Sequence, residues 1–408
     1  AITTGTNNTI IGGLAGDATT TGERNTAVGT SSLTTNTTGS GNSAFGFKSL
    51  ENSTTASNNT AFGQDTLRAT TTGTDNVAVG IDALTANTTG AENTAVGSGA
   101  LDANTTASGN SAFGKDSLGA NTTGSSNAAY GSNSLKVNTT GGSNVAIGIG
   151  SLQANTTANN NTAVGKSALA ANTTGTQNTA VGTVAGTALT TGSYNVFIGD
   201  AAGDAVTTAD SNVAVGQNAL TNTTTGTQNT ALGRQSLQTN TTANNNTAVG
   251  HQSLFANTTG AQNTALGALA LDANTTAGNN TAVGYASLTA NTTGASNAAF
   301  GLNSLYANTT GGSNVAVGQD ALFANTTADN NTAIGKGSMV ANTTGANNVA
   351  IGLEALTANT TASNNVAIGA DAGKSITTGT QNVILGTAAG DAQTTGSHSV
   401  ALGYGALG

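Results

Sequence analysis

The sequence predicts an all-β fold, a parallel β-roll (β-solenoid) in which one 17-residue repeat makes one coil. An asparagine recurs in equal steps, at Asn8, Asn25, Asn42 and onward to Asn382, and Ser399 takes its place in the last of 24 units. A glycine always follows at the fourth position after it, and no unit is longer or shorter than the others. Helical repeats need about 30 or more residues, so units this short favour brief strands joined by turns. We count positions in a unit from this asparagine, position 0.

Each coil is expected to hold two strands and two turns. In the unit that begins at Asn93, we predict a first strand from Thr94 to Val96 and a second from about Ala100 to Thr106. Glycine adopts backbone angles that other residues avoid, so the glycine at +4 is assigned to the turn between them. In four successive units these turn glycines are Gly97, Gly114, Gly131 and Gly148.

Compensating substitutions predict which side chains fill the coil. Position +2 is alanine except at Ile10, Phe197 and Ile384, and each of these three units has glycine instead of leucine or methionine at +8. A larger neighbour refills the cavity that a lost leucine leaves, so +2 and +8 are expected to touch in the core. The predicted core residues are Ala95, Leu101, Ala112, Leu118, Ile10, Phe197 and Ile384.

Position +3 is a large apolar residue in every unit, yet alternation along a strand points it outward if +2 points inward. Monomers rarely leave such a patch bare, so we expect several copies of the chain to associate along it. The predicted chain–chain interface contains Val28, Phe45, Phe62, Val79, Val96, Phe113, Tyr130 and Ile147.

Composition excludes several functions. Of 408 residues only 7% are charged, nine are Lys or Arg and the net charge is −9, which argues against nucleic-acid binding. No apolar run reaches membrane-spanning length, so no membrane insertion is expected in this segment. The chain has no cysteine, and its two histidines, His251 and His398, lie far apart in the repeat. We therefore expect no enzyme activity, catalytic residue, metal or cofactor.

Three patterns leave alternatives open. The Thr-Thr pair at +12 and +13 is explained by β-propensity, or by an ice-binding file with one threonine per coil. Asn-Thr-Thr sequons are explained by the Asn- and Thr-rich turn, or by glycan acceptors; they include Asn36, Asn87, Asn104, Asn121 and Asn257. Asp65 and Asp82, on adjacent units, are explained as structural carboxylates, or as the pair of a glycosidase.

The units with glycine at +8 come as neighbours, and the segment Ala-Gly-Asp-Ala recurs after every eleventh unit, beginning at Ala15, Ala202 and Ala389. These paired units are explained by a local change in the radius of the roll, or by a site for another chain. Because this longer pattern is cut at both ends, residues 1–408 are expected to form a single repetitive shaft or head, a stretch of a longer fibre.

The stretch Asn144-Val145-Ala146-Ile147-Gly148 resembles the head repeat of YadA-like trimeric autotransporter adhesins. Arrays that combine Asn-Thr-Ala-Val-Gly with Asn-Thr-Thr-Gly also resemble repeat regions of phage tail fibres. The resemblance covers the whole chain. It implies a left-handed roll with three chains side by side, although the coil of this chain is longer than usual for such heads.

Together these features predict an extracellular fibre on a cell surface or virion, an adhesin head or a rigid shaft that presents a binding tip. The expected partners are further copies of the chain, as a homotrimer, and a host surface receptor or glycan. The alternative is a self-assembling structural filament without a receptor. An ice-binding solenoid ranks third.

Overall fold

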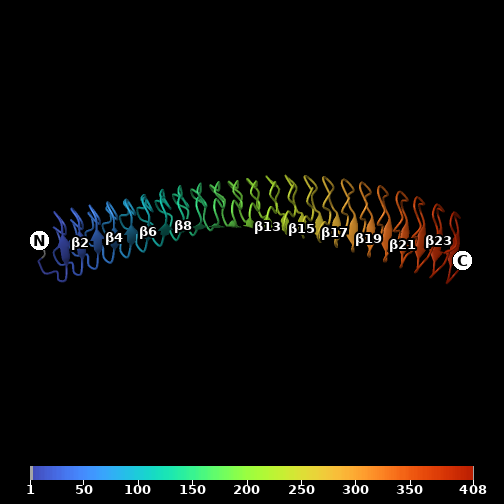
Figure 1. Ribbon diagram of the computed structural model, residues 1–408, viewed down its shortest axis with the longest axis horizontal. Coiled ribbons are helices and arrows are strands. Elements are labelled where there is room, and N and C mark those ends of the chain that lie inside the picture. Colours follow the sequence, from blue (N-terminus) through green and yellow to red (C-terminus); the bar gives the residue numbers. More distant parts are fainter. Residues whose placement is uncertain (1–2, 408) are drawn as a thin grey trace. The chain divides into compact units, whose positions relative to one another are not determined.

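The computed structural model describes residues 3–407, and this range contains strands and turns but no helix. The chain is a parallel β-solenoid of about 23 turns with 17 residues per turn, which confirms the predicted fold class and repeat. Backbone contacts divide it into two compact units, Ala1–Ala209 and Asp210–Gly408. Within each unit the coils follow one another in chain order (Figure 1).

Every strand has three residues and occupies positions +1 to +3 of its repeat. The first unit contains β1 (Thr9–Ile11), β2 (Thr26–Val28), β3 (Ser43–Phe45), β4 (Thr60–Phe62), β5 (Val77–Val79), β6 (Thr94–Val96), β7 (Ser111–Phe113), β8 (Ala128–Tyr130), β9 (Val145–Ile147), β10 (Thr162–Val164), β11 (Thr179–Val181) and β12 (Val196–Ile198). The second unit contains β13 (Val213–Val215), β14 (Thr230–Leu232), β15 (Thr247–Val249), β16 (Thr264–Leu266), β17 (Thr281–Val283), β18 (Ala298–Phe300), β19 (Val315–Val317), β20 (Thr332–Ile334), β21 (Val349–Ile351), β22 (Val366–Ile368), β23 (Val383–Leu385) and β24 (Val400–Leu402).

Strands that are consecutive within a unit pair in parallel, and equal repeat positions lie opposite each other. In β6 and β7, for example, Ala95 faces Ala112 and Val96 faces Phe113. Each repeat position therefore forms a file of residues that runs from coil to coil.

The glycine at +4 is fixed by backbone geometry. Gly97 has φ +139°, and a Cβ atom built there would lie 2.5 Å from the carbonyl oxygen of Gly114 in the next coil. Only glycine adopts this φ readily, and any side chain would collide with backbone that has no room to move. The unbroken file of glycines follows from this packing.

The predicted second strand is wrong. Residues Ala100 to Thr106 form turns, and Leu101 lies in the left-handed region at φ 53°. The segment still bonds from coil to coil, since Leu101 N–H donates to Ser117 at 3.0 Å and Thr105 N–H to Thr122 at 3.1 Å. A left-handed residue interrupts the pleat, so these bonds do not extend into a ladder.

The +2 and +8 side chains fill the interior. Ala95, Leu101, Ala112 and Leu118 have no exposed area, nor do Phe197 and Ile384. Ile10, in the first strand, is half-buried. The core is therefore a file of alanines packed beside a file of leucines.

The neighbouring glycine coils have a packing explanation. A Cβ atom at Gly203 would lie 2.6 Å from Cδ1 of Phe197, and one at Gly186, in the preceding coil, would lie 2.7 Å from Cδ2 of the same ring. Ile384 stands in the same relation to Gly373 and Gly390. One large +2 side chain thus fills the space of two leucines, which is why these glycines occur in adjacent coils.

Two files of buried asparagines also run through each unit. We call the file at position 0 the anchor ladder and the file at +11 the inner ladder. In the anchor ladder, Asn93 Oδ1 accepts from the backbone N–H of Asn110 at 3.0 Å, and Asn93 Nδ2 donates to the Ala107 carbonyl at 2.8 Å. In the inner ladder, Asn104 Nδ2 donates to Asn87 Oδ1 at 2.9 Å.

Candidate functional site

The outward face of the sheet carries an apolar feature that recurs from coil to coil. It carries the file of +3 residues, which we call the apolar stripe, and beside it the file of +1 residues. Among the residues predicted as an interface, Phe62 is 59% exposed and Ile147 42%. The structure places Phe113 and Tyr130 on the same exposed face and leaves Val28, Phe45, Val79 and Val96 half-exposed. All eight side chains share one face because their strands are in register.

Aromatic side chains along the stripe contact one another. The rings of Phe113 and Tyr130 stack with centroids 4.9 Å apart and planes 7° apart, and those of Phe45 and Phe62 tilt against each other at 5.7 Å. Stacking between coils covers the ring faces and leaves their edges outward. The stripe is therefore a continuous ridge of side chains.

A second surface lies on the turn after the strand, where the +6 and +9 side chains meet. It carries four cations that form ion pairs within the chain, and we call it the loop face. Its pairs are Lys48–Glu51 at 3.5 Å, Arg68–Asp65 at 3.3 Å, Lys136–Asp116 at 3.3 Å, and Lys374 with Glu354 and Asp371 at 2.6 and 2.9 Å. Lys374 Nζ donates hydrogen bonds to the carboxylates of Glu354 and Asp371, and these bonds raise the pKa of Lys374 above its usual value, so the ammonium stays charged.

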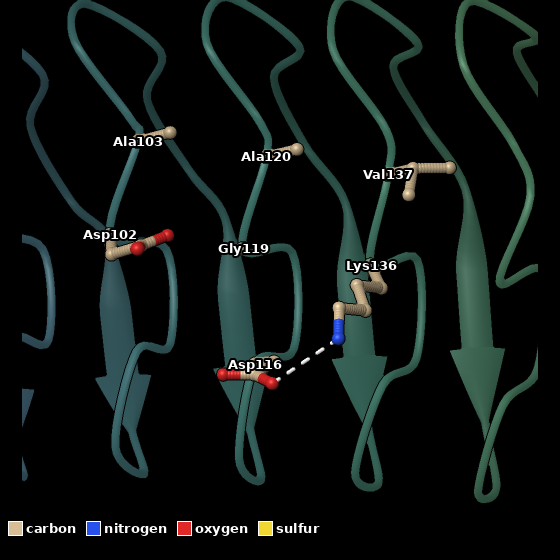
Figure 2. A pocket seen from close by; sticks show the side chains of 7 residues that line it. All are labelled: Asp102, Ala103, Asp116, Gly119, Ala120, Lys136 and Val137. Carbon is tan, nitrogen blue, oxygen red and sulfur yellow. Dashed lines mark hydrogen bonds and ion pairs between the residues drawn. The ribbon is translucent and has the colours of Figure 1, made fainter.

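The loop face of the first unit contains a shallow depression of about 320 Å³. Figure 2 shows Asp102 and Lys136 on either side of Gly119, with the Lys136–Asp116 ion pair beside them. Asp102, Gly119 and Lys136 occupy position +9 of three successive coils. Because Gly119 has no side chain, the space between the other two stays open. Burial raises the pKa of Asp102, and the nearby Asp116 carboxylate adds to this rise. The arrangement offers two carboxylates and one ammonium, which are suited to polar contacts.

The pair considered for glycoside hydrolysis is divided between two environments. Asp65 is only 9% exposed and accepts hydrogen bonds from Arg68 and Gln64, whereas Asp82 on the next coil is exposed. Asp65 is thus engaged within the chain, in keeping with the structural interpretation.

The sequon asparagines are not presented at the surface. Asn36, Asn87, Asn104, Asn121 and Asn257 belong to the inner ladder and have no exposed area. Each Nδ2 donates to the backbone carbonyl at the third position after it. Because a glycan would be attached at this nitrogen, the folded chain does not offer these side chains as acceptors.

The threonine pair is split between interior and surface. At +12, Thr105 is half-buried and its hydroxyl donates to the Thr122 carbonyl at 3.2 Å, while Thr106 at +13 is exposed. Away from the two ends of the described range, each coil therefore exposes one threonine of the pair. This matches the single file that the sequence predicts.

No protein-family model matches the chain, and no curated protein is similar enough to be identified as a relative. No helix in residues 3–407 is long and apolar enough to cross a membrane. In the same range no three His, Cys, Asp or Glu side chains gather in a way that would hold a metal ion.

Sequence reasoning missed the loop face and the depression at Gly119. A signal existed, because Lys136 and Asp116 are separated by one full coil plus the step from +6 to +9. The same spacing joins Lys374 to Glu354. Recognising it requires knowing that these two positions share a face, and the erroneous second strand concealed that.

Proposed function

We propose that this chain is the repetitive part of an extracellular fibre, in which several copies pack side by side along the apolar stripe. The observation that carries the proposal is the exposure of a large apolar side chain on coil after coil, always on one face of the sheet. Isolated soluble proteins rarely expose contiguous apolar patches beyond a few hundred Å².

The stripe is large enough for a specific interface. Tyr130 is 40% exposed, and full burial of an aromatic side chain covers roughly 150–250 Å². Twelve stripe residues of that size and exposure would therefore present on the order of 700–1,200 Å² in one unit. A standard protein–protein interface buries about 800 Å² on each partner.

The coil-to-coil bonding suits a mechanical role. Backbone bonds, the Thr hydroxyls at +12 and two amide ladders all join each coil to the next. We propose that the fibre acts as an adhesin head or as a rigid shaft that presents a binding tip on a cell surface or virion. A host receptor or glycan is then its outside partner.

The number of copies and the hand of the roll come from the resemblance of the Asn-Val-Ala-Ile-Gly unit to YadA-like heads. On that basis we propose a left-handed homotrimer. The competing proposal, a filament without a receptor, predicts open-ended growth of the purified protein in place of a fixed small assembly.

The test compares the mass in solution with that of the 39.0 kDa chain. The double change Val96→Asp and Phe113→Asp places charges in the stripe on adjacent coils and should dissociate the copies while circular dichroism stays unchanged. Thr106→Asp with Thr123→Asp is the matched control, since these exposed residues lie on the same two coils away from the stripe. A wild-type monomer, or a stripe variant that stays assembled, contradicts the proposal.

A further inference from the structure

The two borders of the exposed sheet face carry opposite charges. All strands of a unit are parallel and in register, so the residues at +15 and +16, just before the next strand, lie along one border. The residues at +5, just after the turn glycine, lie along the other. We call these the N-terminal border and the C-terminal border.

In the first unit the C-terminal border contains two cations, Lys115 and Lys166, and one acid, Asp200. The N-terminal border contains three acids and one base, which are Glu23, Asp75, Glu92 and Arg24. The second unit repeats the pattern. Its C-terminal border holds Arg234 and Lys336, and its N-terminal border holds Asp210 and Asp329. All of these side chains are exposed.

The border charges differ from those of the loop face in their pairing. Every cation at +6 or +9, namely Lys48, Arg68, Lys136 and Lys374, has an acidic partner within the chain. Among residues 3–407, no salt bridge involves the four C-terminal border cations. The chain has nine Lys and Arg in all, and five of them lie outside the loop face. Four of these five are on the C-terminal border, beside the stripe, and form no ion pair within residues 3–407.

We propose that the C-terminal border of one copy docks on the N-terminal border of a neighbouring parallel copy, so that unlike charges meet at both edges of each apolar stripe. This rests on the proposed self-association and adds the orientation of the copies and the residues that set it. Complementary charges at the rim of an interface direct which surfaces meet and exclude wrong registers.

The opposite charges of the two borders favour parallel over antiparallel packing of neighbouring copies. If neighbouring copies ran antiparallel with their stripes side by side, like borders would meet, lysine against lysine and acid against acid. Parallel copies related by rotation about the axis of stacking place each cationic border on an anionic one. Such a contact is heterologous, because the two surfaces that meet are different, and it closes into a ring when the rotation permits.

The experiment reverses each border separately and then both together. Changing Lys115, Lys166, Arg234 and Lys336 to Glu should weaken association on the order of tenfold or more, because two acidic borders then meet. Changing Glu23, Asp75, Glu92, Asp210 and Asp329 to Lys should weaken it similarly, and combining both sets should restore the wild-type assembly. Sedimentation equilibrium at about 50 mM salt measures all three, since higher salt screens exposed charges.

The control reverses four cations on the loop face, with Lys48, Arg68, Lys136 and Lys374 changed to Glu. This alters net charge by the same amount as the C-terminal border variant but should leave association unchanged. Equal assembly of wild type and both single-border variants, or a combined variant no better than either, would overturn the border proposal. The fibre proposal fails only if the wild-type chain itself is a monomer, so the two failures are distinguishable.

Discussion

The anchor ladder and the inner ladder contain the same residue in equally buried positions, yet only one of them tolerates exchange. Position 0 is asparagine in every unit but the last, where Ser399 stands. Position +11 is asparagine in most units but becomes Ser53, Thr70 and Thr223 in some and Leu189, Val206 and Ile376 in others. Both files are shielded from water, so burial alone does not explain the difference.

The two ladders differ in the group that donates a hydrogen bond to each asparagine Oδ1. An anchor Oδ1 accepts a backbone N–H of the next coil, as Asn93 does for Asn110, so the main chain depends on the side chain. An inner Oδ1 accepts the Nδ2 of the next inner asparagine, as Asn104 does for Asn121 at 3.0 Å. Backbone groups cannot be removed by mutation, whereas two side-chain groups can be replaced together by apolar ones at little cost. Apart from Ser399 in the last unit, exchange is therefore confined to the inner file.

The inner ladder ends where an apolar residue follows it. Asn172 Oδ1 and Asn359 Oδ1 are buried without a hydrogen-bond partner, and the next coils hold Leu189 and Ile376. Those coils are stabilised by packing around Phe197 or Ile384. The comparison thus separates coils held together by polar bonds from coils held together by a large side chain.

The largest expected effect concerns the coils that replace the ladder by packing. Phe197→Ala should cost about 3–5 kcal/mol of local stability, because two glycines leave its space unfilled. Adding Gly186→Leu and Gly203→Leu should recover more than half of that loss by restoring ordinary coils. Hydrogen exchange of the peptides around β11 and β12 measures local opening directly.

The two leucine changes without Phe197→Ala are the control, and they should destabilise the same peptides because the ring occupies that space. If the triple variant is no more protected than Phe197→Ala, the +2 side chain does not substitute for the two leucines. The packing account of the glycine coils would then be wrong.

A direct comparison of the ladders uses one substitution at both positions. Asn93→Leu should lower the free energy of local unfolding by about 3 kcal/mol, because the buried backbone N–H of Asn110 loses its acceptor. Asn104→Leu should cost about 1–2 kcal/mol, since it leaves Asn87 Oδ1 and one Nδ2 hydrogen of Asn121 unpaired but no backbone group, and it adds apolar contact. Hydrogen exchange in the two coils that contain Asn93 and Asn110 reports both, and equal losses would show that the ladders do not differ in kind.

Much of the fold could be predicted because every unit of the repeat shows the same pattern of strand, turn and core residues. The strand Thr94–Val96 has the predicted bounds. The link between +2 and +8 was visible because Phe197 and Gly203 change together, and in the structure the Phe197 ring occupies the space that a Cβ at Gly203 would need. A single globular sequence contains no such internal series of substitutions.

The second half of the coil could not be predicted for a physical reason. Leucine ordinarily avoids left-handed backbone, so a file of leucines suggests an extended segment, whereas Leu101 is held left-handed by its bonds to the neighbouring coils. Gly186 and Gly203 occupy the same position as Leu101 in other coils, and glycine there was the one indication of a left-handed residue. Because the loop face depends on this turn, its ion pairs and the depression at Gly119 were missed with it.

The smallest expected effect repairs a gap in the inner ladder. Asn36 Oδ1 and Ser53 Oγ are buried without hydrogen-bond partners on neighbouring coils. Ser53→Asn should raise local stability by about 1 kcal/mol, because the new amide can donate to Asn36 Oδ1 and, as Asn36 does to Gly39, to the carbonyl at the third position after it. Thr55→Asn, at an exposed position of the same coil, is the control and should have no effect. Slower hydrogen exchange around Asn36 in the first variant alone would show that the inner ladder stabilises the coil through its own continuity; unchanged exchange would mean that a serine there already satisfies its neighbours, for instance through a buried water molecule.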